Sequence, residues 1–347
     1  MRASAWISLC VRLVAIAQLA CFLTPVPSHA AYHLVKRAVL GGDGGWDCLT
    51  VDPAAHRLYI ARSNRVMVVS TDDLKLIGEI APTPGVHDVV LAPDGKLGFA
   101  TDGSDTNAAI FDPRTLKITG HVRTGLRPDI AVYDPASRLV FAMNAGSNSA
   151  TAIDARTAQS VGAVELGGRP EFAVADGHGR LFVNLEDSSQ VRVVDTKTLA
   201  AGPRWSLGSG EEPTGIALDP AAHHLFVSCA NEKMVVLDAD SGRVLATLPT
   251  GKGVDGAAYD PGKGRAFSPS GGDSVLSVIG RKPDGDWAVL ETVPTERGAR
   301  TIAPDERTHR VYLVTARFGP PPAPTAERPH PRGAILPGTF EILVYGE

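Results

Sequence analysis

The chain has 347 residues, of which 44% are hydrophobic, 21% charged and 6% aromatic; it is long enough for a large domain and is neither disordered nor fibrous in composition. Glycine and proline contribute 36 and 26 residues, which favours many short strands joined by turns over long helices. The formal net charge of −4 provides no basic surface, so we do not expect nucleic acid or an anionic membrane surface as the main partner.

The first 30 residues have the pattern of a cleaved signal peptide. Arg2 and Arg12 accompany an apolar run over residues 13–17, acidic residues are absent, and the segment ends in a small-x-small sequence before Ala31. A membrane anchor is the alternative, but Arg12 and Gln18 interrupt the run well before the roughly 20 apolar residues that a span needs. We therefore expect a periplasmic or secreted protein, with no membrane span after cleavage.

A repeated phrase organises residues 31–347 as a single domain. An apolar run closes in Asp-Pro or a similar pair, and a polar turn and a second apolar run follow, as in IAVYDPASRLVFAM and IALDPAAHHLFVS. The first residue of the pair recurs every 40 to 45 residues, at Asp52, Ala92, Asp134, Asp176, Asp219, Asp260 and Asp305. Seven such units without helical periodicity predict an all-β fold, a seven-bladed β-propeller.

Each unit is predicted to supply four antiparallel strands. In the third unit they cover residues 129–133, 138–143, 150–154 and 160–166, and the innermost is apolar on consecutive residues, as expected where both faces of a sheet are covered. An Asp opens the hairpin after the third strand in several units. We expect these carboxylates to accept backbone hydrogen bonds in Asx turns rather than to form a ladder of metal ligands: Asp112, Asp154, Asp195 and Asp238.

The two ends of the domain are predicted to complete one blade. The last unit contains three strands, the third over residues 340–345, and the N-terminal segment over residues 32–40 supplies the missing outer strand and closes the ring. A proline-rich insertion at residues 318–339 separates the second and third strands of this seventh blade. Cys48 and Cys229 fall on non-adjacent blades, so we expect both to be buried and unpaired.

Several phrases resemble a known repeat. FAMNAGSNSATAIDART and FVSCANEKMVVLDADSG are similar to the repeat of YVTN-type β-propellers, and the linkers TGLRPDIAV and LGGRPEFAV resemble the junctions between their blades. The similarity covers essentially all of residues 31–347, is greatest to the YncE-like branch of that family, and departs from the motif in the sixth and seventh units. It implies the propeller fold and export, and it implies no common reaction.

Polar residues are predicted to gather at the mouth of the central channel. The residue five positions before each repeat position begins an innermost strand, which gives a set that we call the mouth ring: Asp47, His87, Asp129, Glu171, Thr214, Asp255 and Arg300. Four carboxylates with one His and one Arg on a concave rim suit a divalent cation, Ca or Mg, or a small polar ligand. The alternative is a solvated mouth without a ligand, and a register shift of one residue would place Cys48 or Asp88 in the ring.

The loops between second and third strands add a further set on the same face. We call them the second tier, and they could extend a binding surface or simply satisfy turn geometry: Arg62, Asp102, Asn144, Asn184, Asn231 and Arg317.

Three functions remain open from the sequence. The first is an exported, monomeric binding protein or scaffold that holds a small polar ligand, a cation or a protein partner at the channel mouth. The second is a hydrolase of the lactonase type, in which a carboxylate-bound cation, or a His with an Arg, activates water and polarises the substrate carbonyl; the candidate residues are Glu171, Asp255, His87 and Arg300. The third is an accessory protein of periplasmic quinone-linked oxidation.

Overall fold

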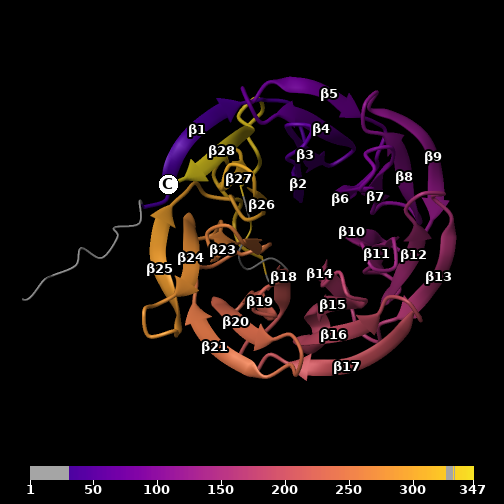
Figure 1. Cartoon of the computed structure of the whole chain (residues 1–347). Helices are drawn as coiled ribbons and strands as arrows, with labels where there is room; N and C mark the ends of the chain where they lie inside the picture. Colours follow the sequence, from indigo (N-terminus) through magenta and orange to yellow (C-terminus); the bar gives the residue numbers. More distant parts are fainter. Residues whose placement is uncertain (1–30, 326–330, 332) are drawn as a thin grey trace, which may run out of the picture. The chain divides into compact units, whose positions relative to one another are not determined.

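The computed structural model describes residues 31–325, 331 and 333–347. Seven four-stranded antiparallel sheets surround a central channel, so the protein is a seven-bladed β-propeller, as predicted (Figure 1). Residues 31–347 form one compact unit. The predicted signal segment, residues 1–30, lies outside the described residues. Within the described part of the chain, no helix is long and apolar enough to cross a membrane.

Every blade has the same strand order from the channel outwards. The innermost strands are β2 (Leu49–Asp52), β6 (Val86–Leu91), β10 (Pro128–Asp134), β14 (Pro170–Ala175), β18 (Pro213–Asp219), β22 (Ala258–Asp260) and β26 (Ile302–Asp305). The second strands are β3 (Arg57–Arg62), β7 (Gly98–Asp102), β11 (Leu139–Asn144), β15 (Arg180–Leu185), β19 (His224–Cys229), β23 (Arg265–Ser270) and β27 (Arg310–Thr315). The third strands are β4 (Arg65–Ser70), β8 (Asn107–Asp112), β12 (Ser149–Asp154), β16 (Gln190–Asp195), β20 (Lys233–Asp238), β24 (Val275–Arg281) and β28 (Glu341–Gly346). The outer strands are β5 (Leu76–Ile80), β9 (Lys117–Arg123), β13 (Ser160–Glu165), β17 (Ala200–Ser206), β21 (Val244–Pro249), β25 (Trp287–Pro294) and β1 (His33–Val39), and a short 3-10 helix, η1 (Glu186–Ser188), follows β15.

The core lies between neighbouring blades rather than at the centre of the ring. Each second strand carries one aromatic side chain that is no more than 1% exposed: Tyr59, Phe99, Phe141, Phe182, Phe226, Phe267 and Tyr312. The apolar cluster around Phe141 of the third blade, for example, includes Leu181 and Val183 of the fourth. Because both faces of the blades are covered in this way, the inner strands are apolar on consecutive residues instead of alternating.

Asx turns occupy the face opposite the mouth ring. The Asp that opens each predicted hairpin accepts a hydrogen bond from the backbone N–H two residues further on, at 2.8 Å for Asp112, 2.9 Å for Asp154, 3.0 Å for Asp195 and 3.1 Å for Asp238. The carboxylates therefore serve turn geometry, as the sequence analysis expects.

The N-terminal strand closes the ring, also as predicted. Strand β1 pairs with β28 from His33 opposite Gly346 to Val39 opposite Glu341. The preceding residue, Tyr32, is buried and sets its ring edge-on against Phe267 of the sixth blade, with the centroids 5.2 Å apart. The closure thus fixes the sixth blade as well as the seventh. Both cysteines of the described chain are buried and unpaired.

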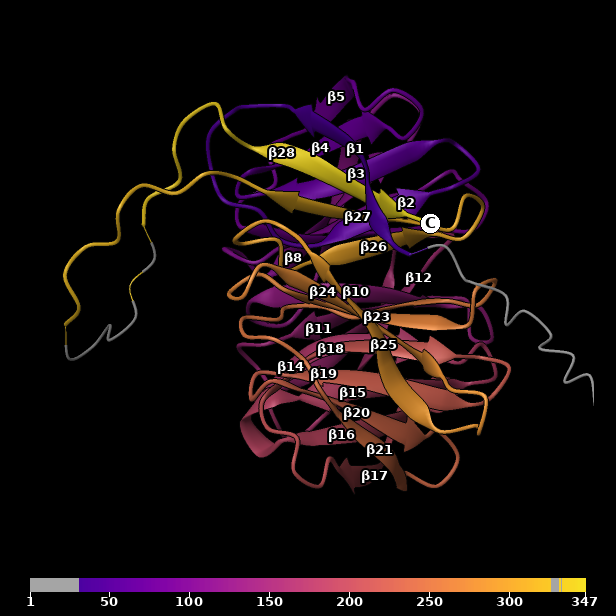
Figure 2. The same ribbon diagram turned by 90° about the vertical axis from the view of Figure 1, so that its left-hand side faces the viewer.

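The proline-rich insertion leaves the ring on the same face as the mouth ring. Its two ends are joined by a bridge between Phe318 and Ile335, and the N–H of Gly319 donates to the carbonyl of Ala334 at 2.8 Å. Beyond this stem, the described part projects away from the face between β27 and β28 (Figure 2). Residues 326–330 and 332 lie outside the described residues.

Candidate functional site

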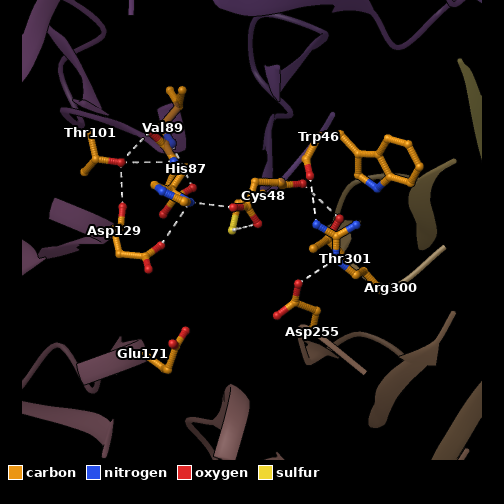
Figure 3. Close-up of polar contacts among 12 residues, drawn as sticks. Trp46, Cys48, His87, Val89, Thr101, Asp129, Glu171, Asp255, Arg300 and Thr301 are labelled. Atoms are coloured by element: carbon orange, nitrogen blue, oxygen red, sulfur yellow. Dashed lines mark hydrogen bonds and ion pairs between the residues drawn. The ribbon is translucent and has the colours of Figure 1, made fainter. Parts of the chain in front are cut away.

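Three residues of the mouth ring come together at the starts of the first three innermost strands. His87 Nδ1 lies 2.6 Å from Asp47 Oδ2 and 3.5 Å from Asp129 Oδ1 (Figure 3). The opposite edge of the imidazole rests on Gly103, where a Cβ atom would lie 2.4 Å from the ring. Glycine at this position therefore lets the ring turn its Nδ1 towards both carboxylates.

The electrostatics of this cluster favour positive charge. The hydrogen bond that His87 donates to Asp47, together with the nearby negative charges, raises the pKa of His87 to about 9 despite the opposing effect of burial. Burial raises the pKa of Asp129 to about 6, and the charges of Asp47 and Asp255 act in the same direction while His87 opposes them. Burial raises the pKa of Glu171 to about 8, and the charges of Asp129, Asp255 and Asp47 act in the same direction. The carboxyl groups of the mouth ring thus lie close together in a confined space, and the nearby cations do not fully neutralise their negative charge.

On the other side of the mouth ring, Arg300 and Asp255 form an ion pair. Arg300 Nε donates to Asp255 Oδ2 at 2.6 Å, and Arg300 Nη2 donates to the carbonyl of Trp46 at 2.8 Å. The hydroxyl of Thr301 donates to the carbonyl of Asp47 at 2.9 Å. These contacts fasten the seventh blade to the first and join the two sides of the mouth ring.

The two remaining ring positions stand apart from the cluster. Glu171 faces the channel without joining the three-residue group (Figure 3), and Arg169 approaches it to 3.9 Å. The hydroxyl of Thr214 donates to the carbonyl of Val254 in the next blade at 3.3 Å. The structure therefore assembles Asp47, His87 and Asp129, and separately Asp255 and Arg300, from the seven predicted residues.

The assembled three residues have the donor set of a cation site. One ligand atom from each of Asp47, His87 and Asp129 lies within 4.8 Å of the other two. Two carboxylates and an imidazole can bind divalent metals such as manganese or zinc, and the imidazole makes the set less suited to the all-oxygen preference of calcium or magnesium.

Asp88 lies one residue beyond the mouth ring and points into the protein. Its carboxylate accepts hydrogen bonds from the backbone N–H groups of Val89 at 2.8 Å and Ala131 at 3.1 Å. It lines a cavity of about 230 Å³ in the channel, together with Cys48. Burial raises the pKa of Asp88 to about 7. The predicted ring register places His87, and not Asp88, at the mouth.

Most of the second tier is inside the protein. Arg62, Asp102, Asn144 and Asn184 are at most 1% exposed. The amide of Asn144 donates to Ser149 and Thr151 and therefore supports its own hairpin. The side chain of Asn231 accepts a hydrogen bond from the backbone N–H of Glu211 at 3.1 Å and donates one to the carbonyl of Ser209 at 2.9 Å. It therefore supports the neighbouring loop that contains these two residues. Of the six second-tier residues, Arg317 is the one with an exposed side chain.

Arg62 is a buried cation that secures the segment leading into the first blade. Its guanidinium carbon lies 3.5 Å from the ring centroid of Phe340, and Nη2 donates to the carbonyls of Asp43 at 2.9 Å and Gly44 at 3.2 Å. Burial lowers the pKa of Arg62 to about 10. The residue thus acts on the loop before Trp46 and does not face the channel.

We expect Asp102 to contribute a pH dependence to the stability of the protein. Its Oδ1 is buried without a hydrogen-bond partner among the described residues, and burial, followed by the charge of Asp105, raises the pKa of Asp102 to about 7. The folded state therefore holds a proton that the unfolded state releases near pH 4, so the contribution of Asp102 to stability falls as the pH rises from about 4 to 7.

Asp102→Asn removes this dependence because the amide cannot ionise. The difference in the free energy of unfolding between the variant and the wild type should be about 2–4 kcal/mol more favourable to the variant at pH 8 than at pH 4. Urea unfolding at both pH values measures this difference. Asp105→Asn, at an exposed position on the same loop, is the control and should shift the difference much less. A gain that is the same at both pH values would contradict the assignment.

Comparison with known proteins supports the fold and leaves the function open. The sequence matches no protein-family model and no curated protein. Among solved structures, a chain of Kuenenia stuttgartiensis hydrazine synthase is similar at 15% identity with a TM-score of 0.69, over 79% of this chain and 94% of that chain. A chain of a mitotic checkpoint complex is similar at 13% identity with a TM-score of 0.72, over 98% of this chain and 99% of that one. At these identities the likeness shows the propeller fold alone.

A cavity of about 480 Å³ beside the mouth ring was not predicted from the sequence. We call it the insertion cavity because Phe318 and Ile335, from the stem of the insertion, form one of its walls. Trp46, Arg300 and Arg297 are also in the lining, and the side chain of Arg297 is exposed. Two features of the sequence could have indicated this cavity: the position of Trp46 next to Asp47, and the glycine-rich loops of the sixth and seventh blades. Neither signal shows that the stem of the insertion lies beside these residues.

Proposed function

We propose that this protein is an exported binding protein whose channel mouth holds a divalent cation through Asp47, His87 and Asp129. The observation that carries the proposal is the approach of one ligand atom from each residue to within 4.8 Å of the others. A cation there would leave coordination positions open towards the channel mouth, where a small polar ligand or a side chain of a protein partner can complete the shell.

The charge distribution supports this proposal. His87 and Arg300 are the two cations of the mouth ring, and the guanidinium of Arg300 is already paired with Asp255. The carboxylates of Asp47 and Asp129 therefore share the positive charge of one imidazole. A divalent ion relieves the remaining repulsion and displaces the imidazole proton, so its affinity should increase with pH. The imidazole favours manganese or zinc over the calcium or magnesium that carboxylates alone would suggest.

Family membership and export form a further part of the proposal. The YVTN-like phrases and the junctions between blades support placement in the YncE-like branch, and the N-terminal pattern of residues 1–30 supports a periplasmic or secreted location. A protein partner at the mouth is compatible with the fold, since one structural neighbour is a chain of a multi-protein checkpoint complex.

Hydrolysis of the lactonase type is less well supported by the geometry. A general base must be unprotonated and free to accept a proton near neutral pH. Without an ion, the hydrogen bond to Asp47 raises the pKa of His87 to about 9, and with the proposed ion bound the imidazole is a ligand. Arg300, the candidate for polarising a carbonyl, is held by Asp255 and by the carbonyl of Trp46. A role beside quinone-linked oxidation has no specific observation in its favour.

The cation proposal is tested by thermal unfolding in the presence of metal ions. Saturating Mn²⁺ should raise the Tm of the wild type by about 3–6 °C, because an ion at 100 times its Kd stabilises the folded state by about 2.7 kcal/mol. Ca²⁺ and Mg²⁺ at the same concentration should have a smaller effect. Asp47→Asn combined with Asp129→Asn should abolish the Mn²⁺ effect.

Glu232→Gln is the matched control, since it removes a carboxylate from an exposed loop on the same face. This variant should keep the full response to Mn²⁺. A wild-type Tm that no divalent ion changes, or an equal rise in the wild type and the double variant, would contradict the proposal.

A further inference from the structure

The insertion cavity has the opposite electrostatic character to the mouth ring. Its lining includes Arg297 and Arg300 and, among the described residues, no acidic side chain. The charge of Arg300 is compensated by Asp255 at 2.6 Å. Arg297 is exposed, and its guanidinium has no hydrogen bond or ion pair with any residue that the structure describes. Within the described part of the chain, Arg297 is therefore an accessible cation of the cavity without a paired anion.

Aromatic and aliphatic side chains form the walls. Trp46 and Phe318 have ring centroids 6.0 Å apart and are inclined by 52°, and Ile335 lies beside them in the lining. Trp46 is 6% exposed, and its Nε1 has no acceptor among the described residues. A planar apolar group fits such walls because aromatic rings pack favourably in inclined and offset arrangements.

Backbone forms much of the remaining surface. Six of the lining residues are glycines. A Cβ at Gly271 would lie 2.8 Å from the carbonyl carbon of Gly298, and a Cβ at Gly298 would lie 2.8 Å from the ring of Phe318. The loops of the sixth and seventh blades thus press together under the stem of the insertion. This close packing leaves an open space of about 480 Å³ above them, which is within the range of roughly 300–1,000 Å³ typical of small-molecule sites.

We propose that the insertion cavity binds a planar aromatic carboxylate, with its ring packed against the wall formed by Phe318, Ile335 and the edge of Trp46 and its carboxylate on Arg297. A carboxylate suits the planar fork of donors on an arginine, which binds it with two parallel hydrogen bonds. A phosphate monoester is less suitable because it carries up to two negative charges. The guanidinium of Arg297 can pair with one of them, and the apolar walls would desolvate the other without pairing it. This site is separate from the cation site, since it uses none of Asp47, His87 and Asp129.

The proposal is tested with naphthalene-2-carboxylate and naphthalene-2-carboxamide as probes, which share their shape and differ in charge. Calorimetric titration of the purified protein, in EDTA to exclude binding through a metal ion, should give saturable binding of the carboxylate with a Kd on the order of 10–100 µM. The carboxamide should bind at least tenfold more weakly. Equal binding of the two probes, or failure of the carboxylate to bind, would overturn the proposal.

Two variants locate the site. Arg297→Gln should weaken the carboxylate at least tenfold and leave the carboxamide nearly unchanged, whereas Phe318→Ala should weaken both probes. Arg123→Gln, at an exposed arginine that ends β9 and does not line the cavity, is the control and should bind as the wild type does. Because Arg297 is exposed, its variant should retain the wild-type Tm. Unchanged carboxylate affinity in Arg297→Gln would place the ligand elsewhere and refute the site.

Discussion

Deletion of residues 32–40 is expected to destabilise the protein by about 3 kcal/mol or more, although most side chains of β1 are exposed. The loss comes from what β1 covers. All six residues of β28 are buried, and without β1 this strand becomes an unpaired edge. The deletion also removes Tyr32 from its contact with Phe267. At roughly 25 cal/mol per Å² of apolar surface, exposing about 120 Å² already accounts for this loss.

Thermal unfolding measures the effect, which should lower the Tm by at least about 5 °C. Removal of Glu347 is the control at the other terminus. Its side chain forms an ion pair with Lys263 at 2.5 Å, and the loss of one such pair should cost at most about 1 kcal/mol. Equal Tm values for the two truncations would show that the N-terminal strand does not hold the ring closed.

Phe267→Ala is expected to lower the free energy of unfolding by about 3–5 kcal/mol, as large-to-small substitutions of fully buried aromatic residues do. Phe267 is completely buried in the apolar cluster between the sixth and seventh blades. Phe318→Ala removes the same number of atoms from the half-buried stem of the insertion and should cost about 1 kcal/mol. Urea unfolding compares the two variants.

Phe267→Ala and the deletion of residues 32–40 should also be less than additive, because both remove the contact with Tyr32. Strict additivity would mean that this contact contributes nothing to closure. Similar losses in Phe267→Ala and Phe318→Ala would contradict the assignment of the insertion to the periphery of the core.

The repeat made the fold predictable from the sequence. The strands expected in the third unit differ from β10, β11, β12 and β13 by no more than one residue at each end. Local physics explains this agreement, because each Asp-Pro phrase fixes a turn and each following apolar run must be buried against the next blade. The closure of the ring by β1 followed from counting strands in the last unit.

The candidate site was less predictable because its contacts join different blades. The repeat placed Asp47, His87 and Asp129 at equivalent positions, yet the 2.6 Å contact between His87 and Asp47 depends on the orientation of the imidazole against Gly103. A repeat register defines where a residue lies along a strand and not which neighbour its side chain reaches. The same limit explains Thr214, whose hydroxyl is used by the adjacent blade.

The second tier shows how loop residues can mislead. Asn and Arg at the end of a strand suggest a polar surface, but Arg62 is fully buried because it stacks on Phe340 from the seventh blade. Phe340 is distant in sequence, and ring closure brings it next to the first blade. The insertion cavity depends on the same closure, since Trp46 and Phe318 lie at opposite ends of the domain sequence. Contacts across the closure were therefore the least accessible to sequence reasoning.

Anomalous diffraction from crystals grown with Mn²⁺ can show whether Asp47, His87 and Asp129 hold a cation. We expect an anomalous peak at the channel mouth, within metal-coordination distance of a carboxylate oxygen of Asp47, a carboxylate oxygen of Asp129 and a ring nitrogen of His87. The peak should be absent from crystals of the variant that combines Asp47→Asn with Asp129→Asn. A mouth without anomalous density at saturating Mn²⁺, or a peak bound by other residues, would show that these three residues do not form a cation site.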